Sequence, residues 1–262
     1  MGAKAGVWGR LGEWLRHHGS TVCVFCHLGT DDGLLCRRCQ QGMLQDWRRF
    51  QRCWRCGLRL QPVGPAAASA TPFSCCADCR RQQRTWQRVV AVVDYVEPWT
   101  LWIQALKQAR QWQLARPMGA LMAQAWRQQL LCPEGPTIWV PIPARPASWR
   151  ERGFNPALEL ARHAVGQVPE AQLRLWLCWQ KAALAQADDA QKWRTRQQRR
   201  YHLRDAFAGH RLLAGQRVVL VDDVFTTGFT LQAAARACLS AGAAQVWGLV
   251  FARTPKASFW PS

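Results

Sequence analysis

The sequence lacks any hydrophobic run close to the ~20 residues that a membrane-spanning helix requires. Its first twenty residues also lack the apolar core of a secretory signal peptide, because charged residues and two histidines interrupt them. These two absences favour a soluble cytoplasmic protein with no membrane span.

Acidic residues are also scarce. The chain of 262 residues has 16 Asp and Glu against 35 Lys and Arg, which gives a formal net charge of +19. This excess favours a polyanionic partner, because phosphates that bind Lys and Arg release their counterions. Arg lies close to Trp in several segments, and the two residue types can hold phosphates and stack on bases. The alternative explanation is a composition bias toward Arg and Trp.

The segment VVLVDDVFTTGFT, residues 218–230, joins an apolar run to two carboxylates and a hydroxyl-rich loop. The apolar residues predict a parallel strand that is buried on both faces. Asp222 and Asp223 then fall near the carboxyl end of this strand, the edge at which open α/β sheets bind ligands. Apolar residues at helical spacing follow from Leu231 onward.

The loop between strand and helix is suited to one phosphate group. It offers the hydroxyls of Thr226, Thr227 and Thr230, and Gly228 allows backbone N–H groups to converge on an anion. A nucleotide P-loop fits this segment less well, because it requires a lysine directly after its last glycine and none follows Gly228. Two carboxylates before such a loop favour a phosphorylated sugar, because they can accept hydrogen bonds from ribose hydroxyls. The alternative is an ordinary buried strand and turn, in which an acidic pair would be costly.

A second informative segment is WVPIPARPASWRERGFN, residues 139–155. A predicted strand ends at Pro143, and a predicted helix begins near Pro156. The loop between them carries three arginines, and Arg binds phosphate through two parallel hydrogen bonds. We expect Arg145, Arg150 and Arg152 to hold a pyrophosphate opposite the hydroxyl-rich loop, although a basic surface turn would have the same spacing.

Eight of the twelve cysteines form four C-x2-C pairs, all before residue 80. Each pair places two thiolates at one tetrahedral ion, so four pairs predict two zinc sites without an open coordination position. Such closed sites are structural. The expected ligands are Cys23, Cys26, Cys36, Cys39, Cys53, Cys56, Cys76 and Cys79.

The order in which the pairs combine is open. Sequential pairing closes shorter loops at lower entropic cost than a cross-braced arrangement, and is therefore favoured. Cys75 could replace Cys76 as a ligand. The isolated Cys132, Cys178 and Cys238 are expected to be small buried apolar residues.

The composition predicts four regions. Residues 1–20 form an N-terminal tail, and residues 21–85 a double zinc-ribbon region. A larger α/β domain follows over residues 86–255, where strand-like and helix-like segments alternate. Residues 256–262 form a C-terminal tail.

Four C-x2-C pairs, the stretch LWIQALK at residues 101–107, the PIP…RGFN block and DDVFTTGFT together resemble the ComF family. Members of this family are proteins associated with competence and DNA utilisation that are built on a phosphoribosyltransferase fold. The last motif is similar to the 5-phosphoribosyl-1-pyrophosphate (PRPP) motif of type I phosphoribosyltransferases. The resemblance covers nearly all of residues 20–255.

The resemblance implies a type I phosphoribosyltransferase-like fold, with a mostly parallel sheet flanked by helices, preceded by the small zinc-ribbon region. It also implies that Mg²⁺ binds together with PRPP. Asp222 and Asp223 would be the catalytic acids that orient the ribose. The PRPP site would comprise Asp222, Asp223, Val224, Phe225, Thr226, Thr227, Gly228 and Thr230, with Arg145, Arg150, Arg152 and Lys107 on the pyrophosphate.

Two functions remain open. The chain could be a phosphoribosyltransferase, an enzyme of pentosyl transfer, acting on an unidentified acceptor. It could instead be a nucleic-acid-binding protein of DNA uptake, in which the phosphoribosyl pocket is a non-catalytic sensor. Single-stranded DNA and proteins of the DNA-uptake machinery are the expected partners. The arginines expected to contact DNA flank the cysteine pairs: Arg48, Arg49, Arg80, Arg81 and Arg84.

Overall fold

The structure is a computed structural model. It describes residues 50–60, 74–108, 111–128, 135–180 and 205–256, short stretches between residues 22 and 43, and the single positions 133 and 183. The tail at residues 1–20, Arg48, Arg49 and Cys132 lie outside the described residues, as do residues 257–262 of the C-terminal tail.

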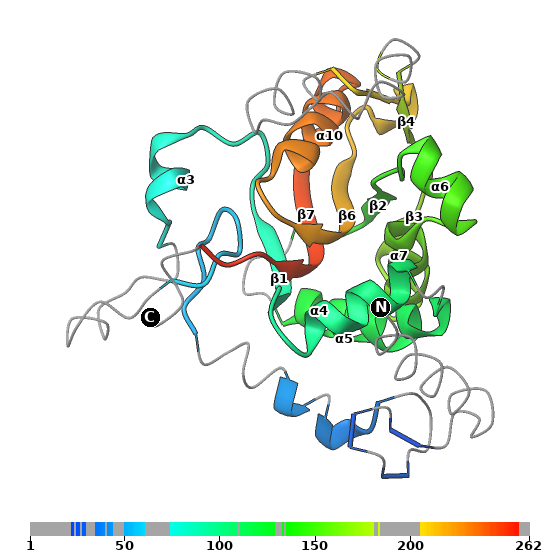
Figure 1. Ribbon diagram of the computed structural model, residues 1–262. Helices are drawn as coiled ribbons and strands as arrows, with labels where there is room; N and C mark the ends of the chain where they lie inside the picture. Colours follow the sequence, from blue (N-terminus) through cyan, green and yellow to red (C-terminus); the bar gives the residue numbers. More distant parts are fainter. Residues whose placement is uncertain are drawn as a thin grey trace, which may run out of the picture.

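The centre of the molecule is a parallel sheet of five strands in the order β1-β7-β6-β2-β3 (Figure 1). The strands are β1 (Val89–Asp94), β2 (Thr137–Pro141), β3 (Ala171–Leu173), β6 (Arg217–Phe225) and β7 (Gln245–Arg253). Side chains of β1, β2 and β7 are buried almost throughout, because helices or cysteine ribbons cover both faces of the sheet. The predicted fold class is confirmed.

Helices cover the two faces unequally. The face that includes Val219, Val221 and Leu249 packs with α4 (Trp99–Gln108), α5 (Ala115–Arg127) and α7 (Pro156–Val165). The face that includes Val218, Leu220 and Val250 packs with α10 (Phe229–Ser240). Figure 1 shows α10 on one side of the sheet and α4, α5 and α7 on the other. Two short helices, α3 (Ala77–Arg81) and α6 (Pro146–Arg152), complete the α-helices named along the described chain.

The two cysteine regions lie against opposite faces of this sheet. Cys23 belongs to the same core as α4, α5 and α7. Cys53, Cys56 and Cys76 belong to the core that contains α10. Each region therefore contributes to the hydrophobic core, and neither is an appendage joined only by the chain.

A separate two-stranded antiparallel sheet pairs β4 (Leu177–Trp179) with β5 (Phe207–Gly209). On β4 the side chain of Cys178 is exposed, and its thiol donates a hydrogen bond to the carbonyl of Ala208 at 3.6 Å. The expectation of burial was therefore wrong for Cys178, because this strand buries only its alternate positions Leu177 and, in part, Trp179. Cys238 is buried as expected.

Among the residues that the structure describes, no helix combines the length and hydrophobicity needed to cross a membrane.

Candidate functional site

The acidic pair lies near the carboxyl end of the long strand β6. Asp223 is 8% exposed, and its Oδ2 lies 2.7 Å from Nζ of Lys107 on α4. Asp222 is partly buried, and its Oδ1 accepts a hydrogen bond from the backbone N–H of Asp223 at 2.9 Å. Lys107 thus compensates one of the two carboxylates directly. The ion pair also fixes the end of α4 against the carboxyl edge of the sheet.

The surroundings of Asp222 change its ionisation. Burial, followed by the negative charge of Asp223, raises the pKa of Asp222 to about 7, although Lys107 acts in the opposite direction. At neutral pH Asp222 therefore changes between a hydrogen-bond donor and an acceptor. A group with this behaviour in a pocket is suited to binding hydroxyl groups or to transferring a proton.

A pocket of about 240 Å³ opens beside this acidic pair. Its walls come from five segments: the end of α4, the loop after β2 together with α6, the start of α7, β4, and β6 with the start of α10. Cationic and acidic side chains share the pocket, so one ligand could contact both. The lining side chains with charges or hydroxyls are Lys107, Arg145, Ser148, Arg152, Asp222, Asp223 and Thr230.

The predicted site residues divide into those that line the pocket and those that do not. Arg145 and Arg152 face it, whereas Arg150 is exposed on α6 and does not line it. Thr230 lines the pocket. Thr226 and Thr227 come before Thr230 in the loop, and neither of them lines the pocket. The pocket therefore brings together both acids, Lys107, two of the three arginines and one of the three loop hydroxyls.

The loop geometry depends on Gly228. Its φ of +83° lies in the left-handed region, and it is the N-cap residue of α10. A Cβ atom at this position would approach the ring of Phe225 to 2.5 Å, which no side chain tolerates. Glycine thus lets the chain turn directly from β6 into α10, so that the positive end of the helix dipole meets the loop.

Asn155 and Trp179 hold the arginine-bearing loop in place. Nδ2 of Asn155 donates to the carbonyl of Ile142 at 2.9 Å, and its Oδ1 accepts from the backbone N–H of Ala157 at 3.1 Å, capping α7. The indole N–H of Trp179 donates to the carbonyls of Pro143 (3.1 Å) and Ala144 (2.9 Å). Trp179 also lines the pocket. The sequence prediction missed Trp179, because its short strand lies far from the motifs.

Arg253 was missed as well. It is 8% exposed at the end of β7, and one guanidinium nitrogen donates to the carbonyls of Phe225 (3.0 Å), Thr226 (2.6 Å) and Thr254 (2.7 Å). A single arginine thus holds the first backbone carbonyls of the loop. The sequence did offer a sign of this role, because Arg253 is a charged residue at the end of an otherwise apolar strand.

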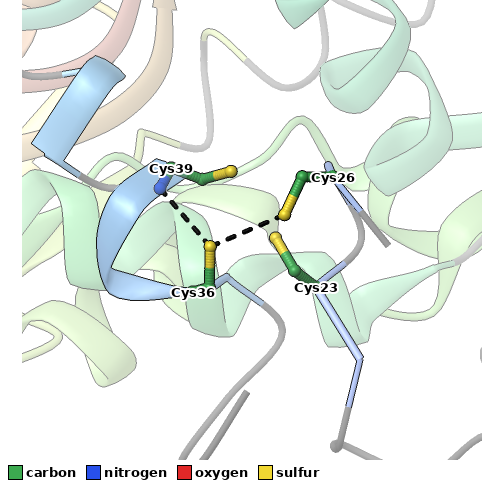
Figure 2. A group of neighbouring side chains, drawn as sticks. All are labelled: Cys23, Cys26, Cys36 and Cys39. Atoms are coloured by element: carbon green, nitrogen blue, oxygen red, sulfur yellow. Dashed lines mark hydrogen bonds between the residues drawn. The ribbon is translucent and has the colours of Figure 1, made fainter. Parts of the chain in front are cut away.

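The eight cysteines of the four pairs form two groups, each with its ligand atoms within 4.8 Å of one another. Figure 2 shows the first group, in which Cys23 and Cys26 face Cys36 and Cys39. The thiols of Cys26 and Cys36 lie 3.6 Å apart, and Cys36 also accepts from the backbone N–H of Cys39 at 3.4 Å. Sequential pairing, the favoured arrangement, is confirmed for this group.

The second group is the more deeply buried one and contains Cys53, Cys56, Cys76 and Cys79. The thiols of Cys56 and Cys76 lie 3.7 Å apart, and Cys53 accepts from the backbone N–H of Cys76 at 3.2 Å. Cys76 rather than Cys75 completes the group. Four soft thiolate donors at tetrahedral spacing fit zinc in both groups, and neither group leaves a ligand position for water or substrate.

We expect purified protein to carry two zinc ions per chain, because eight thiolates complete two closed tetrahedra. Elemental analysis of protein prepared without chelator measures this ratio directly. Replacing Cys26 and Cys39 by Ser should lower the ratio to one. The isolated, exposed Cys178 offers the matched control, since Cys178→Ser should leave the ratio at two. A ratio near zero in the unaltered protein would contradict the zinc assignment.

Comparisons with known proteins show which family and which domain the chain resembles. The family described as Phosphoribosyl transferase domain matches residues 160–258. The chain is 32% identical over 240 residues to the DNA utilization protein YhgH of Salmonella typhimurium, covering 87% of this chain and 96% of that protein. It is 33% identical over 207 residues to the YhgH protein of Escherichia coli K12, covering 75% and 82%. It is 28% identical over 243 residues to competence protein F of Haemophilus influenzae, covering 87% and 95%.

Proposed function

The chain belongs to the ComF family, which includes competence protein F and the DNA utilization protein YhgH, and on this premise we propose that its pocket binds PRPP, or a related phosphoribosyl ligand, together with Mg²⁺. The observation that carries the proposal is the pocket beside β6, where two carboxylates, two arginines, a lysine and Thr230 converge from segments far apart in the sequence. Family membership supports an association with DNA uptake.

Each part of PRPP has a matching group. Asp222 and Asp223 can accept hydrogen bonds from the two ribose hydroxyls. The start of α10 with Thr230 suits the 5′-phosphate, because a helix N-terminus favours an anion. Arg145 and Arg152 line the same pocket and suit the pyrophosphate, because Arg binds phosphate through paired hydrogen bonds. Mg²⁺ would supply charge neutralisation of the pyrophosphate when bound.

Binding of PRPP would have to break the ion pair between Lys107 and Asp223. The pair occupies one of the carboxylates that the ribose needs. We infer that Lys107 moves from Asp223 to the pyrophosphate as the ribose hydroxyls arrive. This exchange leaves neither group without a partner: Lys107 gains the pyrophosphate, and Asp223 accepts hydrogen bonds from the ribose hydroxyls. A buried carboxylate without a partner would be costly.

Two outcomes follow binding, and they belong to different classes of function. In a transferase, a nitrogen acceptor attacks the anomeric carbon, the bond to pyrophosphate breaks, and the nitrogen loses a proton. In a sensor, the ligand stays intact and its occupancy alters DNA handling. The two four-cysteine groups and the charge of +19 favour the sensor, whereas the intact acidic pair favours the transferase. Pyrophosphate release from bound PRPP would distinguish them.

A ligand screen by thermal denaturation tests the proposal. With Mg²⁺, PRPP should raise the thermal midpoint, because a ligand that binds only the folded state stabilises it. Ribose 5-phosphate should raise the thermal midpoint less, and glucose 6-phosphate should not raise it.

A single-stranded oligonucleotide should bind with an affinity that falls as salt rises, with a log–log slope of about −0.7 per phosphate contact. No shift with PRPP at millimolar concentration would contradict the phosphoribosyl proposal, and no DNA binding at low salt would contradict the DNA contact.

Of the arginines expected to contact DNA, three lie in the described chain. Arg80 and Arg81 are exposed at the end of α3. Arg84 is partly buried, and its guanidinium lies 5.3 Å from the centre of the Trp86 ring. Arg80→Gln with Arg81→Gln is therefore the appropriate variant for the DNA measurement. Changing Arg84 as well would disturb a buried tryptophan.

A further inference from the structure

Phe225 lies at the point where β6 ends and the candidate phosphate loop begins. It is 3% exposed, and three of its neighbours bear on the course of the loop. The ring of Trp86 meets it edge to face at a centroid distance of 5.9 Å, and the guanidinium of Arg253 lies 4.5 Å from its centre. The third neighbour is Gly228, which leaves no room for a Cβ atom. The position of Phe225 therefore determines where the loop can run.

Trp86 in turn is bound to the turn between the first two ligands of the second cysteine group. Its indole N–H donates to the carbonyl of Arg55 at 2.7 Å, and a guanidinium nitrogen of Arg55 donates to the carbonyl of Trp86 at 2.9 Å. Arg55 lies between Cys53 and Cys56. Trp86 is 1% exposed, so this reciprocal pair joins the cysteine group to the buried face of Phe225.

The same turn lies directly on the sheet. Gly57 follows Cys56 with a φ of +66°, and a Cβ atom there would come within 2.9 Å of the Cβ of Ala91 on β1. Arg52 donates to the carbonyl of Gly57 at 3.0 Å and to Oδ1 of Asp94 at 2.8 Å. The second group is therefore fixed to β1 at close contact, and it cannot shift without displacing Trp86.

Arg253 makes the second connection. Besides holding the carbonyls of Phe225 and Thr226, it lies near enough to Cys56, Cys76 and Cys79 for their charges to act on it. A zinc ion with four thiolates has a formal charge of about −2. Such an anionic centre would compensate the charge of the buried guanidinium, whereas four neutral thiols would not.

We propose that the second cysteine group, through Trp86 and Arg253, positions the phosphate loop, so that zinc in this group and ligand binding at residues 226–230 are coupled. The second cysteine group then stabilises the pocket as well as its own ribbon. The ligand half of this inference rests on the proposed function. Trp86 and Arg253 act as positioning residues, because neither lines the pocket.

The first cysteine group provides the contrast. It lies with the core on the opposite face of the sheet, where Phe25 stacks on Trp99 at a centroid distance of 6.4 Å. Trp99 begins α4, at the end of that helix remote from Lys107. Neither Trp86 nor Phe225 belongs to the core that contains Cys23. Emptying the first group should therefore leave the phosphate loop unchanged.

The test is hydrogen exchange of the amides at residues 225–230 in protein without ligand, combined with zinc analysis. Cys56→Ser with Cys79→Ser should lose one zinc ion and exchange these amides faster by about tenfold or more. Cys26→Ser with Cys39→Ser should also lose one zinc ion, yet exchange them at the rate of the unaltered protein. Calorimetry with Mg²⁺ and PRPP should show weaker binding for the first variant alone.

A second variant covers the case in which the altered second group prevents folding. Arg253→Lys keeps the positive charge, but its shorter side chain ends before the position of the guanidinium nitrogen that holds the three carbonyls. The variant should therefore retain both zinc ions and still exchange the loop faster. Exchange within about twofold of the unaltered protein in Arg253→Lys would overturn the inference. If the unaltered protein fails to bind PRPP while loop exchange still responds to these changes, the phosphoribosyl proposal fails and the coupling stands.

Discussion

Replacing Asp222 and Asp223 together by Asn is expected to weaken binding of PRPP with Mg²⁺ by roughly 2–5 kcal/mol, since two charge-assisted hydrogen bonds to the ribose hydroxyls are lost. Isothermal calorimetry at neutral pH measures the change. The fold should remain intact, because Asn has nearly the same shape as Asp and the buried pair loses its mutual repulsion. Lys107 loses its partner in this variant, but its side chain is 26% exposed and can reach solvent.

The control for this variant should change the net charge equally without touching the pocket. Glu170→Gln with Asp205→Asn does so, because both residues are exposed and neither lines the pocket. The control should bind PRPP as the unaltered protein does. Equal affinity in the Asp222 and Asp223 double variant, with unchanged circular dichroism, would place the ligand elsewhere.

The second large effect concerns pH. In the unfolded chain Asp222 should ionise near its ordinary pKa of about 4, whereas burial and the charge of Asp223 raise its pKa to about 7 in the folded protein. Between these values the folded state retains a proton that the unfolded state has released. The contribution of Asp222 to the free energy of unfolding is therefore most favourable below about pH 4 and is lost as pH rises through about 7, by up to about 4 kcal/mol.

Urea denaturation of the unaltered protein and of Asp222→Asn, over a range from about pH 5 to about pH 8, measures this loss. The variant has no proton to release at this position, so the difference in the free energy of unfolding should shift in its favour as pH rises. The same titration should strengthen PRPP binding, because the ionised carboxylate is the better acceptor for ribose hydroxyls. A difference that does not change with pH would show that Asp222 ionises alike in both states.

The sequence predicted those parts of the site that depend on neighbouring residues. Local periodicity predicts the strand before Asp222, and a backbone angle that favours glycine predicts the turn at Gly228. The low cost of closing a short loop predicts that Cys23 and Cys39 belong to one group. These are properties of a few consecutive positions, so a single sequence contains them.

Contacts between distant segments could not be predicted in this way. Arg253 and Trp86 meet Phe225 only because β7 and the second cysteine ribbon pack against the end of β6. The ion pair of Lys107 with Asp223 depends on where α4 ends above the sheet. The arginines of α6 show the same limit: Arg152 lines the pocket, whereas Arg150, two residues earlier on the same helix, is exposed and does not line it. Periodicity identifies which residues are in a helix, but not which neighbour they face.

The strand order also has a consequence for synthesis of the chain. Strand β1 follows the second cysteine group directly, yet among the described strands it pairs only with β7, the one that comes last in their chain order. Most of the α/β domain separates Val89 from its partner Gly248. While the ribosome makes these residues, β1 presents an unpaired apolar edge, and contacts of such long sequence separation form late in folding. A cysteine ribbon already closed around zinc at that stage would cover one face of β1, at Ala91, before the partner strand emerges.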